Sequence, residues 1–186
     1  MLYTYIDLKK KGYSAYQIEK LVNEKRLYKI EKGLYGTSDN ESDLEIIRTL
    51  YPDSIITLES AFYYYGMLNK KPNFFRLATV QKARKIKREN VKQIFMTDKF
   101  YNLGISNMKY QNVHVVTYDL ERLLIEIVRN KVKIDYDTYN EVIKNYQRIA
   151  KLLNKKKLSL YLPYFKDPKI IERIKNEVYL EKKEDY

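Results

Sequence analysis

The first 36 residues constrain the fold more than any other part of the chain, because a short amphipathic helix leads directly into a tight ribbon. Ser14 is a typical helix N-cap, and Gln17 follows it at the spacing of a capping box. At 3.6 residues per turn the helix has an apolar stripe and, opposite it, a polar one. The stripes consist of Ala15, Ile18, Leu21 and Val22, and of Tyr16, Lys20 and Asn23. The pattern predicts one packed face and one exposed face.

A two-stranded ribbon follows this helix. Leu27 and Lys29 alternate with Tyr28 and Ile30, Lys32 and Gly33 supply a turn, and residues 34–36 form the returning strand. Upstream, residues 3–11 predict a shorter helix that stops at Gly12, as in a helix-turn-helix. Two helices and a ribbon in this order are typical of a winged helix-turn-helix. The alternative interpretation is a set of small amphipathic elements that only pack against the rest of the protein.

The remaining sequence predicts a larger α+β domain. The polar stretch 37–43 is typical of a linker, so we expect a winged helix-turn-helix domain over residues 1–38 and a second domain over 39–186. Runs rich in β-branched and aromatic residues predict strands at 74–80, 92–96 and 113–118. Helical periodicity and capping residues predict helices at 44–50, 57–65, 120–130, 138–153, 158–165 and 169–180.

Composition excludes several classes of protein. With 186 residues and 45% hydrophobic residues, the chain can bury a substantial core. It has no uncharged apolar run of membrane-spanning length and no signal-peptide pattern, so we expect a cytoplasmic protein without a membrane partner. The absence of cysteine excludes disulfides, thiolate metal sites and a cysteine nucleophile.

The formal net charge of +12 is unevenly distributed, which favours an anionic partner such as nucleic acid. Residues 70–92 contain nine Lys or Arg and one acid, and residues 144–157 contain six Lys or Arg and no acid. Residues 39–59 reverse the sign, with six acids and one Arg. A charge run can also be only a solvated face. The candidate nucleic-acid or partner surface of the second domain comprises Lys82, Arg84, Lys85, Lys87, Arg88, Lys151 and Lys155.

Catalytic motifs are weak, so we predict no enzyme activity, no metal and no cofactor. The single histidine, His114, lies in an expected strand, and the five glycines match no phosphate-binding loop. Asp135 and Asp137 have the spacing of two-metal nucleotidyltransferases, but no Gly-Ser turn precedes them, and we interpret Asp137 as a helix cap. A nucleotidyl-transfer enzyme that uses these two aspartates is the third hypothesis. The three tyrosines at 63–65 lie within an expected apolar helix, so we interpret them as packing residues and not as a platform for stacked bases.

Four segments of the sequence, taken together in their order and spacing, are distinctive. They are GYSAYQIEKLV at 12–22, LYKIEKGLY at 27–35, TLESAFYYYG at 57–66 and VHVVTYDLERLL at 113–124. With them the chain resembles, over nearly its whole length, the AbiE-type abortive-infection antitoxins of the AbiEi family, the transcriptional regulators of type IV toxin–antitoxin pairs. Two positions depart from the family pattern. Lys25 stands where a glycine usually follows the recognition helix, and Glu126 is the nearest acid where an aspartate commonly follows the Glu-Arg phrase.

The resemblance implies an N-terminal winged helix that binds operator DNA of its own operon. It also implies a C-terminal domain that neutralises a nucleotidyltransferase toxin encoded beside it, without a stable complex between the two proteins.

The leading hypothesis is therefore an antitoxin that represses its own operon by binding double-stranded operator DNA. We expect Gln17 to contact adenine, Lys20 to contact guanine or phosphate, and the wing to contact the DNA backbone. The alternative is an RNA- or protein-binding module that acts through the basic C-terminal surface. The full set of predicted DNA-binding residues is Ser14, Tyr16, Gln17, Lys20, Asn23, Lys29 and Lys32.

Overall fold

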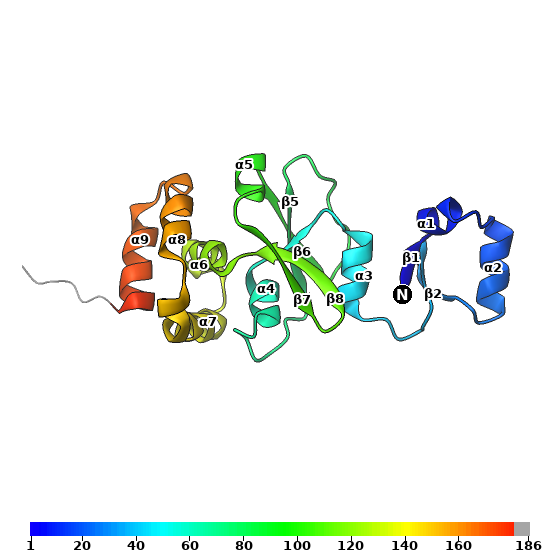
Figure 1. Cartoon of the computed structure of the whole chain (residues 1–186), viewed down its shortest axis with the longest axis horizontal. Helices are drawn as coiled ribbons and strands as arrows, with labels where there is room; N and C mark the ends of the chain where they lie inside the picture. Colours follow the sequence, from blue (N-terminus) through cyan, green and yellow to red (C-terminus); the bar gives the residue numbers. More distant parts are fainter. Residues whose placement is uncertain (181–186) are drawn as a thin grey trace, which may run out of the picture. The chain divides into compact units, whose positions relative to one another are not determined.

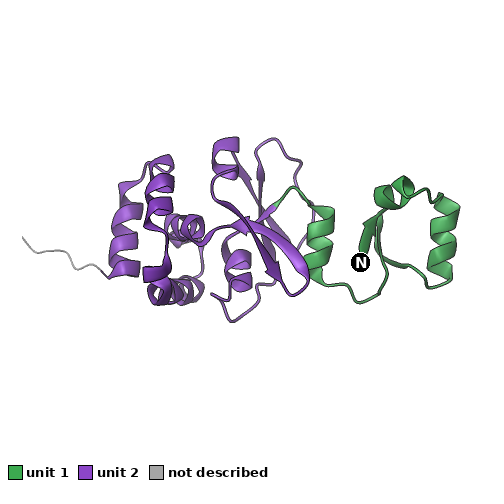
Figure 2. Cartoon of the chain, in the orientation of Figure 1, with its two compact units in different colours: residues 1–54 green, residues 55–186 purple. Residues whose placement is uncertain are grey.

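The structure is a computed structural model that describes residues 1–180. It contains two compact units, Met1–Ser54 and the part of the chain that begins at Ile55 (Figure 2). Both units mix helices and strands, which confirms the predicted α+β class. Within residues 1–180 no helix has both the length and the apolar composition needed to span a bilayer.

The first unit consists of three short strands and three helices (Figure 1). Its antiparallel sheet has the order β1-β3-β2. Strand β2 enters and β3 leaves the predicted turn, so the ribbon and the helix directly before it form as expected. The elements are β1 (Leu2–Thr4), α1 (Tyr5–Lys10), α2 (Ala15–Asn23), β2 (Tyr28–Glu31), β3 (Leu34–Gly36) and α3 (Asp43–Leu50).

The start of the first helix is a correction to the sequence prediction, because residues 2–4 form strand β1. Leu2 pairs with Gly36 and Thr4 with Leu34 in the sheet. Thr4 then caps α1: its hydroxyl accepts a hydrogen bond from the Asp7 amide, and the Asp7 side chain accepts one from the Thr4 amide. The capping box fixes the helix start after Thr4 and leaves the preceding residues extended.

A small apolar core holds α1 and α2 together. Leu8, Ile18 and Leu27 are buried, and Tyr3, Leu21, Val22 and Tyr35 pack against them. Each fully buried aliphatic side chain contributes about 1.5–3 kcal/mol. The core is therefore large enough to fix α2 through one face and too small to cover its other face.

The compact units divide after Ser54, whereas the sequence prediction placed the domain boundary after Ser38. The difference arises from α3, which contacts β1 and so belongs to the first unit. Ser42 begins this helix with a capping box to Glu45. Arg48 then closes the segment by donating to the carbonyls of Pro52 and Ser54. The polar residues 37–42 therefore form a loop inside the first unit, between β3 and α3.

The second unit is built on a mixed five-stranded sheet of order β6-β5-β4-β8-β7. Strands β5, β6 and β8 match the predicted strands to within one residue, and β4 and β7 were not predicted. Strand β4 has only two residues, and β7 is an edge strand without a buried side chain, so neither has a clear hydrophobic signal. The strands are β4 (Ile55–Ile56), β5 (Phe75–Val80), β6 (Val91–Met96), β7 (Ile105–Tyr110) and β8 (Val113–Tyr118).

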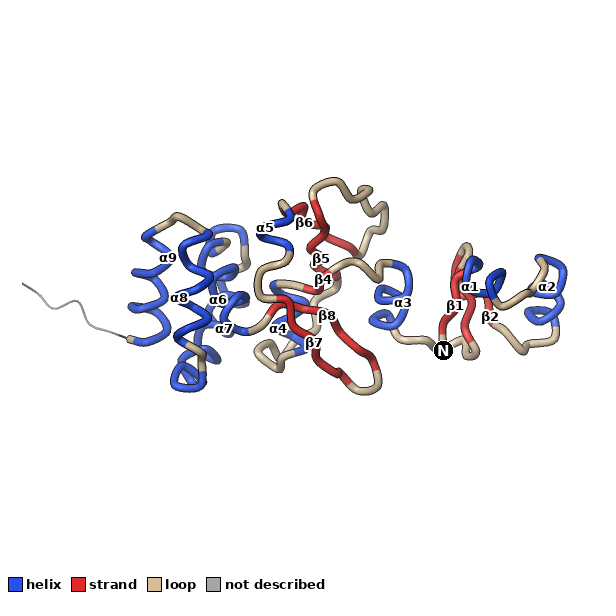
Figure 3. The backbone as a smooth tube through the Cα atoms, turned by 45° about the horizontal axis from the view of Figure 1, so that its top comes forward, coloured by secondary structure: helices blue, strands red, loops and turns tan. Residues whose placement is uncertain are grey.

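Helices α6–α9 gather on one side of this sheet, as Figures 1 and 3 show from two directions. Asp135 caps α7 by accepting a hydrogen bond from the Thr138 amide, so this helix begins two residues before the predicted start, and the cap assigned to Asp137 was wrong. A π-helical turn, Ile174–Tyr179, extends the last helix. The helices are α4 (Leu58–Tyr64), α5 (Asp98–Tyr101), α6 (Leu120–Arg129), α7 (Tyr136–Ile149), α8 (Lys155–Tyr161) and α9 (Pro168–Arg173).

A buried ion pair lies at the centre of this unit. Arg122 on α6 is fully buried and pairs with Glu126 one turn later. One Arg122 nitrogen also donates to the Phe100 carbonyl at 3.3 Å, and the guanidinium lies 5.0 Å from the Tyr118 ring centroid and 4.6 Å from that of Phe165. The pair thereby links α6 to the strand before it and to the segment after α8.

Asp119 forms a second polar contact between α6 and α8. One carboxylate oxygen caps α6 through the Arg122 amide at 2.9 Å. The other accepts hydrogen bonds from the Lys157 ammonium at 2.9 Å and the Tyr161 hydroxyl at 2.8 Å. The hydrogen bond to Asp119 raises the pKa of Lys157, as expected for an ammonium that gains an anionic partner. The predicted cap is confirmed, and it also fixes the position of α8.

Replacing Arg122 with leucine should lower the stability of the second unit by roughly 3–5 kcal/mol, because the buried Glu126 carboxylate would lose its buried cation and, among residues 1–180, keep only Asn130 at 3.1 Å and the half-exposed Arg129 at 3.7 Å. Urea denaturation of the full chain, followed by far-UV circular dichroism, measures the loss. The double variant Arg122→Leu, Glu126→Leu should recover a large part of it. A single variant within 1 kcal/mol of wild type would show that the ion pair is dispensable.

Candidate nucleic-acid interface

Helix α2 is held at its start by the predicted capping box. The Ser14 hydroxyl accepts a hydrogen bond from the Gln17 amide at 3.1 Å, and the Gln17 side-chain oxygen accepts one from the Ser14 amide at 2.7 Å. These two bonds satisfy backbone donors that the first turn of any helix leaves unpaired. Together with the buried Ile18, they fix the rotation of α2 about its axis.

The exposed face of α2 carries the predicted polar stripe. Tyr16 is 76% exposed, and Lys20 and Asn23 are also exposed. On the packed face Ile18 is buried, and Leu21 and Val22 are half-buried, as expected. Ala15 is the exception, since it is exposed at the first turn. Three neighbouring side chains with different chemistry, a phenol, an ammonium and an amide, thus share one accessible surface.

Gln17 does not suit the adenine contact predicted for it. A glutamine that recognises adenine uses its amide oxygen and nitrogen together. In this structure the oxygen already accepts the Ser14 amide hydrogen, so that contact requires the helix cap to open. Ser14 can still contact the DNA backbone. The cap uses its hydroxyl only as an acceptor, so the hydroxyl hydrogen is available to a phosphate oxygen.

Lys20 lies 3.8 Å from Glu24, and Arg26 lies 3.7 Å from the other oxygen of the same carboxylate. Both cations are more than 60% exposed, and ion pairs of this kind contribute little in water. They are available to exchange Glu24 for a phosphate. Arg26 and Glu24 are not among the residues predicted from the sequence to bind DNA, although the four-residue spacing from Lys20 to Glu24 already indicates the ion pair.

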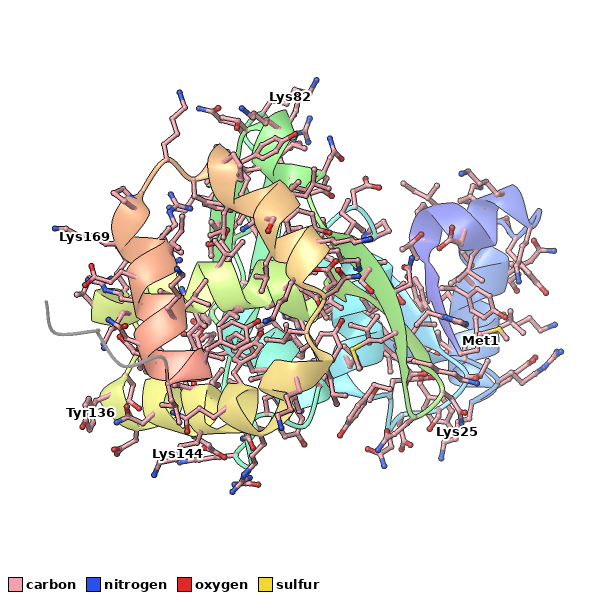
Figure 4. The ribbon with its side chains drawn as sticks, turned by 60° about the vertical axis from the view of Figure 1, so that its left-hand side comes forward. Met1, Lys25, Lys82, Tyr136, Lys144 and Lys169 are labelled. Atoms are coloured by element: carbon pink, nitrogen blue, oxygen red, sulfur yellow. The ribbon has the colours of Figure 1, made fainter. Side chains whose placement is uncertain are left out.

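Lys25 occupies the position where the resembled family usually has glycine, and its backbone is left-handed with φ of 56°. The chain turns there so that the amides of Arg26 and Leu27 both donate to the Leu21 carbonyl. A left-handed conformation costs a non-glycine residue roughly 1–2 kcal/mol. The turn is thus kept at some cost in stability, and it exposes the side chains of Lys25 and Arg26; Figure 4 labels Lys25.

The wing presents its two predicted cations to solvent. Lys29 on β2 and Lys32 in the β2–β3 turn are both exposed. Gly33 completes this turn with φ of 79°, a conformation that glycine adopts without strain. Residues 1–38 contain eight basic and four acidic residues, a net charge of +4, and half of the basic residues lie in the turn after α2 and in the wing. These four are Lys25, Arg26, Lys29 and Lys32.

The predicted surface of the second unit divides between two places. One is the connection 81–90 between the parallel strands β5 and β6, where Lys82, Arg84, Lys85 and Lys87 are exposed; Figure 4 labels Lys82. Arg88, in the same connection, is half-buried and donates to the Asn90 side chain at 2.9 Å.

The other place is the start of α8 and the turn before it. Lys151 and Lys155 are both exposed there. The Lys155 ammonium lies 5.4 Å from the Tyr179 ring centroid.

Gln93 holds the basic connection against the sheet. Its side-chain oxygen accepts the Ile86 amide hydrogen at 2.8 Å, and its nitrogen donates to the Thr79 hydroxyl at 2.8 Å and to the Arg84 carbonyl at 3.1 Å. A single half-buried side chain therefore orders the backbone that carries four exposed cations. The cations were predicted from the sequence, but Gln93 was not, because no distinctive residue pattern surrounds it.

Asp135, one of the residues considered for catalysis, has a structural role in the described chain. Asp135 caps α7, and the hydrogen bond from the Thr138 amide lowers its pKa. His114 is an exposed residue of strand β8. Tyr64 is buried, and Tyr65 donates to the Tyr118 carbonyl at 3.1 Å. Within residues 1–180 no group of three or more His, Cys, Asp or Glu side chains is placed to hold a metal ion.

Comparison with solved structures identifies a protein of similar fold, the RV2827C protein from Mycobacterium tuberculosis, with a TM-score of 0.62. The two sequences are 12% identical, and the matched region covers 85% of this chain and 64% of that chain. This chain therefore spans less than two thirds of the length of that neighbour, and the likeness concerns the fold alone. Neither a protein-family model nor a curated protein sequence matches the chain.

Replacing Lys25 with glycine should stabilise the first unit by about 0.5–1 kcal/mol, since relief of the left-handed strain exceeds the entropy that glycine adds to the unfolded chain. Thermal unfolding of the full chain measures the gain. Lys25→Ala is the matched control, because alanine removes the same charge and keeps the strain. Equal stability of the glycine and alanine variants would contradict the strain argument.

Proposed function

We propose that this protein binds double-stranded operator DNA through its first unit and thereby represses its own operon, as part of an antitoxin function. The observation that supports DNA binding is the exposed face of α2, where Tyr16, Lys20 and Asn23 lie opposite the buried Ile18. An α-helix fits the major groove of B-DNA, and the second helix of a helix-turn-helix is the one that enters it.

In this proposal each side chain on the face has a distinct contact. Asn23 pairs with adenine through its side-chain amide. Gln17 is less suited to this contact, because its side-chain oxygen already accepts the Ser14 amide hydrogen in the helix cap. Lys20 leaves Glu24 for guanine or phosphate, and Tyr16 contacts a base edge or the backbone. The phosphates beside the groove are contacted by Lys25 and Arg26 after the helix and by Lys29 and Lys32 of the wing.

The antitoxin part of the proposal is supported by the AbiEi-type phrases and their positions. The phrases at 12–22 and 27–35 form α2 and the wing, and those at 57–66 and 113–124 form α4 and the junction of β8 with α6. The last of these contains Asp119 and Arg122, which organise the helices of the second unit. On this proposal the second unit neutralises a nucleotidyltransferase toxin without a stable complex.

A second candidate function uses the basic connection 81–90 to bind structured RNA or an acidic protein. The observation that favours it is the order imposed by Gln93, because an ordered cationic loop loses less entropy on binding than a mobile one. The two candidates use different units, so substitutions separate them.

Gel-shift titration against the promoter of the protein's own operon tests the first proposal. Asn23→Ala should weaken specific binding roughly tenfold or more and relax sequence preference, because a bidentate base contact is worth about 1–3 kcal/mol. Lys32→Ala should weaken binding to all sequences and reduce the salt dependence by about one phosphate contact. Lys109→Ala, an exposed lysine of the second unit, is the control of equal charge change. Equal affinity for the promoter and for random DNA would exclude operator recognition.

The second candidate is tested in the full chain with Gln93→Ala. Loss of its hydrogen bonds should increase hydrogen exchange at the Ile86 amide and, if the connection binds RNA, lower RNA affinity while operator binding is unchanged. A variant in which Lys82, Arg84, Lys85 and Lys87 are all replaced with glutamate should lose its affinity for RNA. RNA binding that survives the reversal would eliminate this surface.

A further inference from the structure

The second unit contains a cavity of about 510 Å³ away from the exposed basic connection. The lining comes from α4, from the segment before β5, from β5 and β6, and from the residues around the start of α7. These residues are Glu59, Leu68, residues 70–74, Arg76, Lys92, Lys133, Asp135, Thr138 and Glu141. Its volume lies within the range of small-molecule sites in proteins. Neither α2 nor the connection 81–90 contributes a lining residue, so the cavity is distinct from both candidate interfaces.

Cationic side chains dominate the polar lining of the cavity. They come from four parts of the chain and outnumber the carboxylates by two. The cations are Lys70, Lys71, Arg76, Lys92 and Lys133, and the carboxylates are Glu59, Asp135 and Glu141.

All three carboxylates are engaged by donors of the protein. Glu59 accepts two hydrogen bonds from Arg76, at 2.6 and 3.0 Å. Glu141 accepts the backbone amide and the side-chain amide of Asn69, at 2.8 and 2.7 Å. Asp135 accepts the amide that begins α7. Glu59 is paired with a cation of the lining, whereas Glu141 and Asp135 accept from neutral amides and keep their negative charge, so the five cations leave the lining with a formal net charge of +2.

Three ammonium groups, those of Lys70, Lys92 and Lys133, lie in the lining without a carboxylate at ion-pair distance among residues 1–180. Bringing like charges to one cavity costs free energy unless an anion joins them. The arrangement is thus complementary to a ligand with several negative charges.

Phe74 gives the cavity an aromatic wall. The Lys92 ammonium lies 3.7 Å from the ring centroid and the Arg76 guanidinium 5.2 Å from it, so the ring orients both cations. Leu68 and Pro72 extend the apolar surface beside it. A ligand that uses the whole cavity therefore combines a polyanion with a less polar group.

We propose that this cavity binds a nucleoside di- or triphosphate. The phosphates contact Lys70, Lys92 and Lys133, and the nucleoside lies against Leu68, Pro72 and the Phe74 edge. This recognition uses side-chain cations in place of a glycine-rich backbone loop, so no phosphate-binding motif is visible in the sequence.

Isothermal titration calorimetry of the full chain with ATP, GTP, CTP and UTP tests the proposal. At least one should bind, tripolyphosphate should bind more weakly, and the corresponding nucleoside should not bind. Lys92→Ala and Lys133→Ala should each raise Kd roughly tenfold, the value for loss of one hydrogen bond to a charged group. Both lysines are exposed, and far-UV circular dichroism checks that the variants remain folded.

Lys109→Ala removes the same charge from strand β7, outside the cavity, and should leave Kd unchanged. No binding of any nucleotide would overturn the proposal, and so would equal weakening by Lys109→Ala and Lys92→Ala, which would indicate general attraction to a basic protein. Tripolyphosphate that binds as tightly as the nucleotides would overturn the assignment of the nucleoside to the apolar wall.

Discussion

The second unit depends on burying the charge of Arg122. A guanidinium without solvent is tolerated only when nearly all its interactions are supplied by the protein. Here Glu126, the Phe100 carbonyl and the rings of Tyr118 and Phe165 supply them from three separate segments. Gly104 lies directly against the same side chain, since a Cβ there would be 2.7 Å from that of Arg122. The requirements of one charge therefore fix where the strands, α6 and the segment after α8 meet.

The first unit has a different constraint, because the apolar cluster that holds α1 and α2 is small. Only Leu8, Ile18 and Leu27 are buried in the cluster that holds α1 and α2, and local capping contributes to each helix of the unit: Thr4 with Asp7, Ser14 with Gln17, and Ser42 with Glu45. One consequence is functional. A helix held through a narrow apolar stripe leaves most of its circumference in solvent, and on α2 that circumference carries the polar side chains proposed to contact DNA.

Local signals in the sequence were sufficient for the parts of the fold that are determined locally. The Ser14 cap, the Ile18 face of α2, the wing turn at Gly33 and the Asp119 cap of α6 each follow from a few neighbouring residues. What depends on distant contacts was missed. Nothing near Arg122 indicates that its guanidinium is buried, because its partners at Phe100 and Phe165 are set by the tertiary fold.

The candidate sites show the same limit. Exposure of Tyr16, Lys20 and Asn23 was predictable from periodicity, whereas the conflict in Gln17 needed the observed hydrogen bond, because cap and base contact compete for one oxygen. The cavity could not be predicted at all. Lys70, Lys92 and Lys133 are spread over more than sixty residues, and in the linear sequence they are ordinary surface lysines.

Charge distribution separates the two proposed activities. Residues 1–38 carry +4 and residues 39–54, with five acids and one Arg, carry −4, so the first unit is neutral and the chain's charge of +12 belongs to the second. Long-range attraction therefore contributes little to DNA binding by the first unit itself, and its affinity must come from contacts at the α2 surface and the wing. A basic second unit attracts any polyanion, so there specificity requires a shaped site in addition to charge. The cavity around Phe74 supplies that shape.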